Sequence, residues 1–387
     1  MFRIVWEDFF SPMNADNYSG SYRVLNVCET VTGGVATYLN VLHSSTSGPI
    51  KHHYVLPKSQ SNNVSADLDV SLFNDSSRLV SSKFGFRRVC KLFFATLHAV
   101  RKEKPEIIFF HSSFTLPVML LLRLIVVKKK FVYCPHGWAA LRYPSGSGKR
   151  KLVSLLERSF AKYANVIVNI SNFEMSYAKS VGYLGDHRLI VNAVSDVDCS
   201  SYQEPIITDG ISIDLLFVGR FDHQKGLDIL LNAFERVRSS RQDINLHIVG
   251  CSVRDNADLL KEQAGEIDGV TLYGWRSPYE ISGFYKSVDV MIVPSRWEGF
   301  GLVVAESLRE GTPVIVSNRG ALPEHVEQDK TGYVVNLSEN DFYNKIKFLD
   351  RQALVDMRPA CRAKFEKQYN SDRFAREITD LFKELLE

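Results

Sequence analysis

The stretch DVMIVPSRWEGFGLVVAESLREGTPVIVS, at residues 289–317, decides the fold. It opens with an apolar run that ends at Pro294 and passes through a glycine-containing turn. A helical pattern follows, and Gly311 ends it before a second β-branched run. A strand, a helix and a second strand in this order are typical of a parallel sheet with crossover helices. Because ligands bind beyond the carboxyl ends of such strands, we expect the turn to border a binding site.

The same alternation continues through the whole chain and divides it into two halves. With 387 residues, the chain is longer than the ~100–200 typical of one domain. We expect two doubly wound α/β domains of about six strands each, at residues 1–195 and 211–370, joined by a polar, aperiodic linker at 196–210. The predicted strands lie near residues 22–28, 52–56, 106–110, 131–134, 165–170 and 188–191, and then near 213–218, 245–249, 270–273, 289–293, 313–317 and 333–335.

The composition is that of a globular protein, with an uneven distribution of charge. Hydrophobic residues make up 45% and charged residues 24%, which excludes a collagen-like or largely disordered chain. Residues 1–200 carry 24 Lys and Arg against 14 Asp and Glu, a net charge of +10. Residues 201–387 carry 23 against 30, a net charge of −7. We therefore expect the basic half to face an anionic partner.

Several features indicate a cytoplasmic location. The six cysteines are scattered without a C-x-x-C pair, which argues against a zinc ribbon and against a secreted disulfide framework. Glu7, Asp8 and Asp16 interrupt the N-terminal apolar residues, where a signal peptide needs a continuous apolar core. The apolar stretch at 116–127 is well short of the ~20 residues needed to span a bilayer.

Two glutamates flank the turn in the opening stretch. Glu298 precedes the helix and Glu306 lies within it, so both can face one cleft. Carboxylates accept hydrogen bonds from sugar hydroxyls, so this pattern suits a polyol. The backbone N–H groups of Phe300, Gly301 and Leu302 are expected at a helix N-terminus, where they can hold a phosphate. A hydrolase with paired carboxylates is the alternative, but it does not account for these amides.

The stretch LLFVGRFDHQKGLDILLNAF, at residues 215–234, adds two cations at another strand end. Arg220 and Lys225 lie five residues apart on one loop. An arginine fork and a lysine point charge together suit a diphosphate. Two solvated loop cations are the alternative, but the flanking Gly219 and Gly226 favour a phosphate site.

In the basic half, a glycine pair and two histidines follow predicted strands. Gly33 and Gly34 begin a helical pattern, where backbone N–H groups can approach an anion. A plain strand-to-helix turn is the alternative. His111 and His136 each follow a strand. For His111 a structural role beneath the cleft is favoured, whereas His136, followed by Gly137 in a loop, is expected to be functional.

Together, these motifs resemble the glycosyltransferases of family 4 from about Tyr22 to the C-terminus. The most specific element is the pair Glu298 and Glu306 with seven residues between them. The resemblance implies a GT-B fold, with two Rossmann-like domains facing each other across a cleft, and a C-terminal helix at 371–387 that crosses back to the N-terminal domain. It also implies a retaining transferase that uses a nucleoside diphosphate sugar and requires no metal or other cofactor.

The resemblance further implies a role for each motif residue. Arg220 and Lys225 would bind the donor diphosphate, Glu306 the ribose, and Glu298 and His136 would lie beside the donor sugar. The residues predicted to be catalytic are Glu298, His136, Arg220 and Lys225. The residues predicted to bind the donor are Gly33, Gly34, Gly219, Arg220, Lys225, Trp275, Arg276, Gly299, Phe300, Gly301, Leu302 and Glu306.

The loop GWRSPYE, at residues 274–280, is expected to border the nucleotide base. Ser277 and Glu280 form a capping-box pattern for the next helix, which would expose the backbone of Trp275 and Arg276 to a ligand. Packing of Trp275 in the core is the alternative.

The acceptor is expected on the basic N-terminal half. Residues 83–104 place Phe84, Phe86, Leu92, Phe93 and Leu97 beside lysines and arginines at helical spacing. Such a helix can lie on an anionic lipid surface, and a core helix with a solvated basic face is the alternative. The residues predicted to serve the acceptor or the membrane are His111, Arg87, Arg88, Lys91, Arg142 and Lys149.

The expected function is sugar transfer from a UDP-sugar, or next a GDP-sugar, to a polyprenyl-diphosphate-linked saccharide. This resembles O-antigen and capsule assembly by bacterial enzymes bound peripherally to the inner face of the cytoplasmic membrane. No nucleic-acid recognition motif accompanies the basic surface, so we expect no nucleic-acid partner. One alternative is a GT-B enzyme of soluble metabolism, such as a sucrose or glycogen synthase or a nucleotide-sugar epimerase, which would not need the basic amphipathic surface. A silent sugar-nucleotide-binding scaffold is the other.

Overall fold

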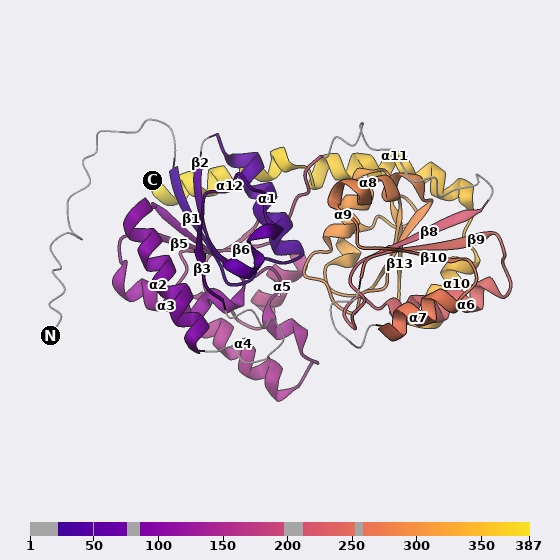
Figure 1. Ribbon diagram of the computed structural model, residues 1–387, viewed down its shortest axis with the longest axis horizontal. Helices are drawn as coiled ribbons and strands as arrows, with labels where there is room; N and C mark the ends of the chain where they lie inside the picture. The colour runs from indigo at the N-terminus through magenta and orange to yellow at the C-terminus, as the bar shows by residue number, and fades with distance from the viewer. Residues whose placement is uncertain (1–21, 49, 76–85, 197–211, 252–257) are drawn as a thin grey trace.

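The computed structural model describes residues 22–48, 50–75, 86–196, 212–251 and 258–387. Two α/β domains lie beside each other, and each has a parallel sheet flanked by helices (Figure 1). The predicted fold class, two Rossmann-like domains with parallel sheets, is confirmed. The predicted linker at 196–210 lies outside the described residues except for its first residue.

The N-terminal sheet has the strand order β3-β2-β1-β4-β5-β6-β7, with every neighbouring pair parallel. Its strands are β1 (Tyr22–Cys28), β2 (Ile50–Pro57), β3 (Val70–Phe73), β4 (Ile107–His111), β5 (Lys130–Cys134), β6 (Val166–Asn169) and β7 (His187–Leu189). Its helices are α1 (Gly34–Thr46), α2 (Phe86–Glu103), α3 (Leu116–Ile125), α4 (Gly148–Ala161) and α5 (Asn172–Ser180), with short 3₁₀ turns η2 (Lys58–Asn63), η3 (Ser113–Thr115) and η4 (Ala139–Arg142).

The C-terminal sheet has the strand order β10-β9-β8-β11-β12-β13, again entirely parallel. Its strands are β8 (Ile213–Val218), β9 (Ile244–Val249), β10 (Val270–Gly274), β11 (Val290–Val293), β12 (Val314–Ser317) and β13 (Gly332–Val335). The helices are α6 (Leu227–Arg238), α7 (Asp258–Glu266), α8 (Pro278–Ser287), α9 (Leu302–Arg309), α10 (Glu339–Lys347), α11 (Arg351–Gln368) and α12 (Ser371–Leu386), with a 3₁₀ turn η6 (Leu322–His325).

The edge strand β3 is absent from the predicted set. It has only four residues, and its apolar side chains Val70 and Leu72 are 36% and 45% exposed. A strand that is short and pairs on one side only carries a weak apolar signal, so its sequence does not stand out. The N-terminal sheet therefore has seven strands among the described residues, where about six were expected.

Strand β4 shows why the central strands are continuous apolar runs. Its residues Ile107, Ile108, Phe109 and Phe110 are all fully buried. Ile107 and Phe109 belong to one apolar cluster, and Ile108 and Phe110 belong to the cluster on the other face of the sheet. A parallel sheet covered by helices on both faces requires apolar side chains at successive positions.

Two C-terminal helices connect the domains. Figure 1 shows α11 along the C-terminal domain and α12 continuing along the N-terminal domain. Helix α12 packs against α1, where the ring of Phe374 contacts Tyr38 edge-on at a centroid distance of 5.3 Å. Phe382, farther along the helix, makes a similar contact with Phe109 at 5.9 Å. The last helix of the chain thus contributes to the core of the first domain.

No helix among the described residues is both long enough and apolar enough to span a bilayer.

Candidate active site

Two loops at neighbouring strand ends meet in the C-terminal domain. Strands β8 and β11 are paired, so the loop after β8 and the loop after β11 leave the same edge of the sheet. Lys225 Nζ on the first loop lies 2.7 Å from Glu298 Oε1 on the second. Ser295 Oγ donates a second hydrogen bond of 3.0 Å to the same carboxylate oxygen. The structure thus joins two of the predicted catalytic residues in a mostly buried ion pair.

Two glycines allow this close approach of backbone. Gly226 is the N-cap of α6 with φ +69°, and a Cβ there would lie 2.1 Å from the carbonyl oxygen of Pro294. Gly301 is the N-cap of α9 with φ +94°, and a Cβ there would lie 2.9 Å from Leu322. A left-handed φ together with a clash at Cβ leaves glycine as the residue that fits at both helix starts.

Arg220 lies on the same loop as Lys225 but in a more open position. Its side chain is 52% exposed, and it pairs with Asp222 at 3.0 Å and donates to Gln224 at 3.3 Å. An exposed guanidinium held by its own loop remains accessible to a ligand in solution. The two predicted diphosphate-binding cations therefore differ in character, since one is buried and paired across loops while the other is solvated.

The starts of two helices from different domains lie close together. A Cβ on Gly34, the first residue of α1, would lie 3.2 Å from the Leu302 side chain at the start of α9. Each helix start offers backbone N–H groups and the positive end of a helix dipole. Two such ends close together favour an anion between them. The predicted Gly33–Gly34 turn and the predicted amides of residues 300–302 are thus brought together.

Two other parts of the predicted donor site are Glu306, on α9, and the loop at 274–280, between β10 and α8. Glu306 on α9 accepts a hydrogen bond of 2.9 Å from the hydroxyl of Tyr285, and burial together with this glutamate raises the pKa of Tyr285. Trp275 is 67% exposed, so its packing in the core is excluded. The capping box of Ser277 and Glu280 is confirmed, with both of its hydrogen bonds present.

His136 lies on a strained turn after β5. Its φ of +50° is in the left-handed region, which non-glycine residues seldom adopt. The turn contacts the donor-side loop, because a Cβ on Gly299 would lie 3.0 Å from the Cα of Gly137. Ser171 Oγ also donates to the Gly299 carbonyl at 2.7 Å. Strain of this kind concentrates at functional sites, where surrounding contacts hold it.

His111 lies beneath His136 and is fully buried. Its Nδ1 is 2.9 Å from His136 Nε2, and its Nε2 is 3.1 Å from Asn26 Oδ1. Burial and the neighbouring histidines lower the pKa of His111 well below its usual range. The assignment of His111 to the acceptor or membrane is therefore wrong, since the side chain does not reach the surface.

Two buried carboxylates that the sequence analysis missed hold the His136 turn. Glu174 is fully buried and accepts hydrogen bonds from the backbone N–H groups of Gly137 and Ile170, and burial raises its pKa to about 8. Glu157 accepts from the N–H of Ala139 at 2.7 Å. A sequence signal exists for Glu174, because Ser171 and Glu174 have capping-box spacing and Ser171 Oγ caps α5.

The two domains are also joined directly at η6. The carboxylate of Glu324 accepts hydrogen bonds from the backbone N–H groups of Asn172, at 3.0 Å, and Phe173, at 2.5 Å. These are the first two residues of α5, so an acidic side chain of one domain caps a helix of the other. This contact lies next to the Ser171 bond and holds the described domains together across the site.

The predicted membrane helix is only partly exposed. Leu92 and Leu97 of α2 are buried in the core, whereas Phe86 and Phe94 are 81% and 65% exposed. The expectation that the apolar stripe of residues 83–104 faces lipid is thus corrected for its middle, which packs against the sheet. Phe84 lies outside the described residues.

The basic residues assigned to the acceptor or the membrane have different surroundings. Arg87, Lys91 and Lys149 are exposed. Arg142 is also exposed, and its guanidinium lies over a phenylalanine ring. Arg88 instead pairs with Glu29 at 2.7 Å and donates to its backbone carbonyl at 2.9 Å.

The exposed apolar surface continues from α2 onto α3 and α4, whose apolar side chains the sequence analysis did not select. We define the three-helix surface as the exposed apolar side chains of α2, α3 with the residues just after it, and α4. Helix α3 contacts both α2 and α4, so these elements are neighbours. The side chains are Phe86, Phe94, Leu121, Leu124, Val127, Leu152, Leu155 and Leu156, each between 43% and 81% exposed.

One group among the described residues has the spacing of cation ligands. The ligand atoms of His53, Asp69 and Glu103 lie within 4.8 Å of one another, at the β2–β3 edge of the N-terminal sheet. His53 Nδ1 is paired with Asp69 at 2.9 Å, and its Nε2 lies 2.8 Å from Ser71 Oγ. None of these residues belongs to the predicted site.

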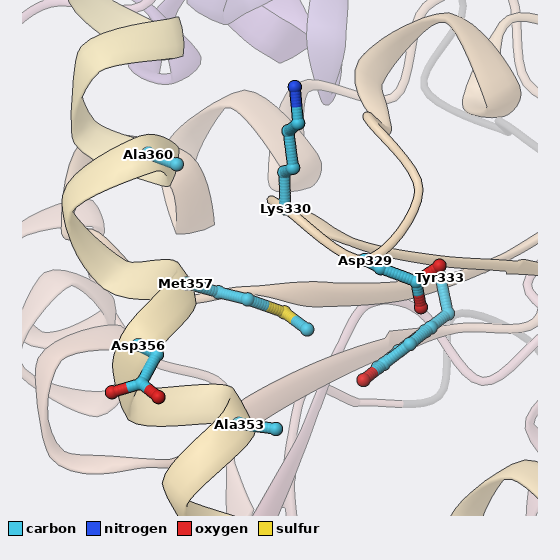
Figure 2. Close-up of a pocket in the computed structure, with 7 residues that line it drawn as sticks. All are labelled: Asp329, Lys330, Tyr333, Ala353, Asp356, Met357 and Ala360. Carbon is cyan, nitrogen blue, oxygen red and sulfur yellow. The ribbon is translucent and has the colours of Figure 1, made fainter.

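A cavity of about 480 Å³ lies elsewhere, between α11 and β13 (Figure 2). Met357 extends from α11 toward Asp329 and Tyr333, while Lys330 points away from them. The cavity is lined by Asp329, Lys330, Tyr333, Ala353, Asp356, Met357 and Ala360. None of the predicted site residues belongs to this set, so the cavity is separate from the candidate active site.

Comparison with known proteins agrees with this geometry. A family model described as Glycosyl transferases group 1 matches residues 207–362, and one described as Glycosyltransferase Family 4 matches residues 33–196. A Klebsiella pneumoniae protein, "Uncharacterized 41.2 kDa protein in cps region", is 30% identical over 374 residues, covering 93% of this chain and 99% of that protein. The chain therefore belongs to the family 4 glycosyltransferases.

Solved structures share the fold at lower identity. Sucrose-phosphate synthase from Thermosynechococcus elongatus has a TM-score of 0.82 and 20% identity, covering 95% of this chain and 99% of that one. Anabaena HepE, solved in complex with UDP and glucose, has a TM-score of 0.72 and 16% identity, covering 94% and 100%. The two-domain arrangement is that of GT-B glycosyltransferases.

Proposed function

We propose that this glycosyltransferase moves a sugar, with retention, from a nucleoside diphosphate sugar to a hydroxyl of a polyprenyl-diphosphate-linked saccharide. The observation that carries the donor half of the proposal is the approach of the α1 and α9 N-termini, with Gly34 against Leu302. The Lys225–Glu298 pair and Arg220 lie on loops at the same sheet edge. A diphosphate is the anion that this combination of amides and cations suits.

The same groups are proposed to support the chemistry. When the bond between the sugar and the diphosphate breaks, negative charge grows on the leaving diphosphate, and fixed amides, Arg220 and Lys225 stabilise it. We propose that the acceptor oxygen attacks from the same face, forming the new bond to the anomeric carbon while its proton passes to a diphosphate oxygen. Glu298, held by Lys225 and Ser295, would accept a hydrogen bond from a sugar hydroxyl. We propose no role for a metal ion in these steps.

A UDP-sugar is the first donor to test, and a GDP-sugar the next. Anabaena HepE, which shares the fold, was solved with UDP and glucose, and this supports trying UDP first. The relative from a cps region supports a role in surface polysaccharide, either capsule or O-antigen.

Thermal unfolding with UDP, GDP, ADP or CMP in the presence of EDTA tests the donor site. A ligand at a hundredfold its dissociation constant adds ~2.7 kcal/mol to the stability of the native state. We expect stabilisation by UDP or GDP in the wild type and its loss in Lys225→Met. Lys330→Met is the matched control, because Lys330 is an exposed lysine of the same domain outside the site. Equal stabilisation in both variants, or none in the wild type, would overturn the assignment.

The three-helix surface supports a lipid-linked acceptor. Lys149 and Lys151 are exposed and lie about one helical turn before Leu152 and Leu155 on α4, so apolar side chains and cations are presented together. Apolar side chains that enter the interface and cations that pair with anionic headgroups are the two requirements for peripheral binding. We propose that this surface rests on the inner leaflet of the cytoplasmic membrane, close to the acceptor.

Co-sedimentation with phosphatidylglycerol-containing vesicles tests this surface, with phosphatidylcholine vesicles alongside. We expect binding that needs the anionic lipid, weakens at high salt and is lost in Leu155→Asp. Leu184→Asp is the matched control, because Leu184 is 57% exposed but lies outside the three-helix surface. Absence of wild-type binding would point instead to an enzyme of soluble sugar metabolism.

A further inference from the structure

A chain of buried hydrogen bonds runs behind His136 into the N-terminal sheet. His136 Nε2 contacts His111 Nδ1 at 2.9 Å, and His111 Nε2 contacts Asn26 Oδ1 at 3.1 Å. Asn26 Nδ2 contacts His52 Nδ1 at 3.1 Å, and His52 Nε2 contacts Thr46 Oγ1 at 2.7 Å. Strand β1, which carries Asn26, is paired with both β2 and β4, so the sheet brings these residues into line.

The inner end of the chain determines its direction. Thr46 Oγ1 lies 2.5 Å from the carbonyl oxygen of Leu42, one turn earlier in α1. A carbonyl oxygen has no proton to donate, so the single hydroxyl proton of Thr46 goes to Leu42. The hydroxyl must then accept its second bond, and His52 must donate that bond from a protonated Nε2.

The donor and the acceptor of each remaining hydrogen bond follow from those of the bond before it. Burial and His43 lower the pKa of His52 to about 3, so this histidine is neutral and carries one ring proton. Because that proton is on Nε2, Nδ1 has a lone pair and accepts a hydrogen bond from the Asn26 amide N–H. The Asn26 amide oxygen therefore faces His111 and accepts from its protonated Nε2. His111 is also neutral, so its Nδ1 accepts from His136.

The same reasoning fixes the protonation of His136, at the outer end of the hydrogen-bond chain. His136 donates inward from Nε2, and burial lowers its pKa to about 3, so Nδ1 carries only a lone pair. That Nδ1 is buried and has no hydrogen-bond partner in the part of the chain that the structure describes. The turn that carries it lies against the loop of Gly299 on the donor side.

We propose that Asn26, His52 and Thr46 are positioning residues that hold His136 as an acceptor of a hydrogen bond from a hydroxyl of the transferred sugar. This inference rests on the proposed function, because it takes the site to hold a donor sugar. Since an unprotonated Nδ1 attracts a hydroxyl and repels a carboxylate, the sugar that binds carries a hydroxyl at that position. His136 therefore does not act as a general acid toward the leaving group.

The opposite direction of the chain is disfavoured by one group. If the Asn26 amide and all three imidazoles were reversed, His52 Nε2 would present a lone pair to Thr46. The Thr46 hydroxyl has one proton and would then face two acceptors, the Leu42 carbonyl and His52, without a second proton. The Thr46 hydroxyl oxygen and the Leu42 carbonyl oxygen, 2.5 Å apart, would then have no proton between them. Such a contact between two oxygens is repulsive, even though the Leu42 carbonyl keeps its helical bond, so Thr46 selects the observed direction.

Nitrogen NMR of [¹⁵N]histidine-labelled protein tests the direction without any activity. We expect His136, assigned with a His136→Gln variant, to be neutral and protonated at Nε2 between pH 6 and 8. Thr46→Val removes the selecting hydroxyl at nearly constant volume, so the His136 signals should shift toward protonation at Nδ1. Thr46→Ser retains the hydroxyl and should restore the wild-type signals. Protonation at Nδ1 in the wild type, or Thr46→Val signals identical to wild type, would overturn the proposal.

Kinetics separate this inference from the proposed function. With UDP-glucose as the probe, we expect the kcat/KM for donor hydrolysis or transfer to fall ~10-fold in Thr46→Val and to recover in Thr46→Ser. UDP binding in the thermal assay should be unchanged in both variants, because Thr46 is remote from the diphosphate groups. Wild-type kcat/KM in a Thr46→Val protein whose His136 tautomer has shifted would refute the positioning role. Loss of UDP binding in the wild type would instead contradict the proposed function.

Discussion

Acidification from pH 7.0 to 5.5 should destabilise the N-terminal domain through its buried histidines. His52 and His136 have pKa values lowered to about 3, and burial lowers that of His111 well below the usual range, so all three stay neutral in the folded protein. In the unfolded chain a histidine has a pKa near ~6.5 and gains most of a proton over this interval. The unfolded state then binds more protons, so the free energy of unfolding falls as the pH falls.

The size of this change in the free energy of unfolding follows from how many protons each histidine binds in the folded and in the unfolded state at the two pH values. For one histidine that titrates only in the unfolded chain, the change from pH 7.0 to 5.5 is about 1.3 kcal/mol. Glu174 opposes this change, because its pKa of about 8 in the folded protein means that the folded state takes up the proton more readily. The contribution of a single histidine is therefore best obtained as a difference between the wild type and a variant.

Urea unfolding of the wild type and His52→Gln at both pH values provides that difference. We expect the variant to lose about 1.3 kcal/mol less on acidification than the wild type, because it lacks one buried neutral histidine. His98→Gln is the control, since His98 is exposed on α2 and should leave the pH dependence of the wild type intact. A pH dependence in His52→Gln equal to that of the wild type would refute the reasoning.

Three further changes test other parts of the site. Lys225→Met leaves the Glu298 carboxylate mostly buried and unpaired, so transfer activity should disappear and urea unfolding should show a loss of about 3–5 kcal/mol. Gly226→Ala forces a side chain into a backbone carbonyl at a left-handed φ, and the same assay should show a loss of at least about 2 kcal/mol. Glu324→Ala removes the acceptor for the first two N–H groups of α5 and leaves the Ser171 cap in place, which should cost about 1 kcal/mol and increase the radius of gyration in small-angle scattering as the domains separate.

Each of these changes has its own control. Glu298→Gln combined with Lys225→Met removes the unpaired charge and should recover part of the stability but none of the activity. Gly148→Ala is the counterpart of Gly226→Ala, because a Cβ at this exposed helix start meets no atom within 4 Å, and it should be neutral or slightly stabilising. An unchanged radius of gyration in Glu324→Ala would mean that other contacts alone hold the domains together.

Much of the fold was predictable because its signals are local. Each predicted strand coincides with an observed one to within a few residues, since a buried parallel strand is a continuous apolar run bounded by polar turns. Strand β3 escaped because its four residues pair on one side only. The loops after β8 and β11 were also predictable, since glycines and charged residues directly after a strand mark a ligand-facing edge.

The residues that the sequence analysis misplaced or did not select share a dependence on neighbours far along the chain. His111 follows a strand just as His136 does, but only the packing of β1, β4 and α1 shows that one lies beneath the other. The leucines of α4 have the spacing of a core-facing stripe, and their exposure depends on nothing being packed over them in the described structure. Spacing reports that side chains share a face, but not what covers that face.

The sequence by itself determined the fold class, the positions along the chain of all the described strands except β3, and which loops leave the binding edge. These features follow from periodicity and from glycine and proline positions, which act over a few residues. Only the tertiary structure decided that Lys225 meets Glu298 across 73 positions, and that one threonine sets the direction of a hydrogen-bond chain ending at His136. Such pairings arise because folding removes water from polar groups and leaves each group only the partners that the packed strands and helices bring within reach.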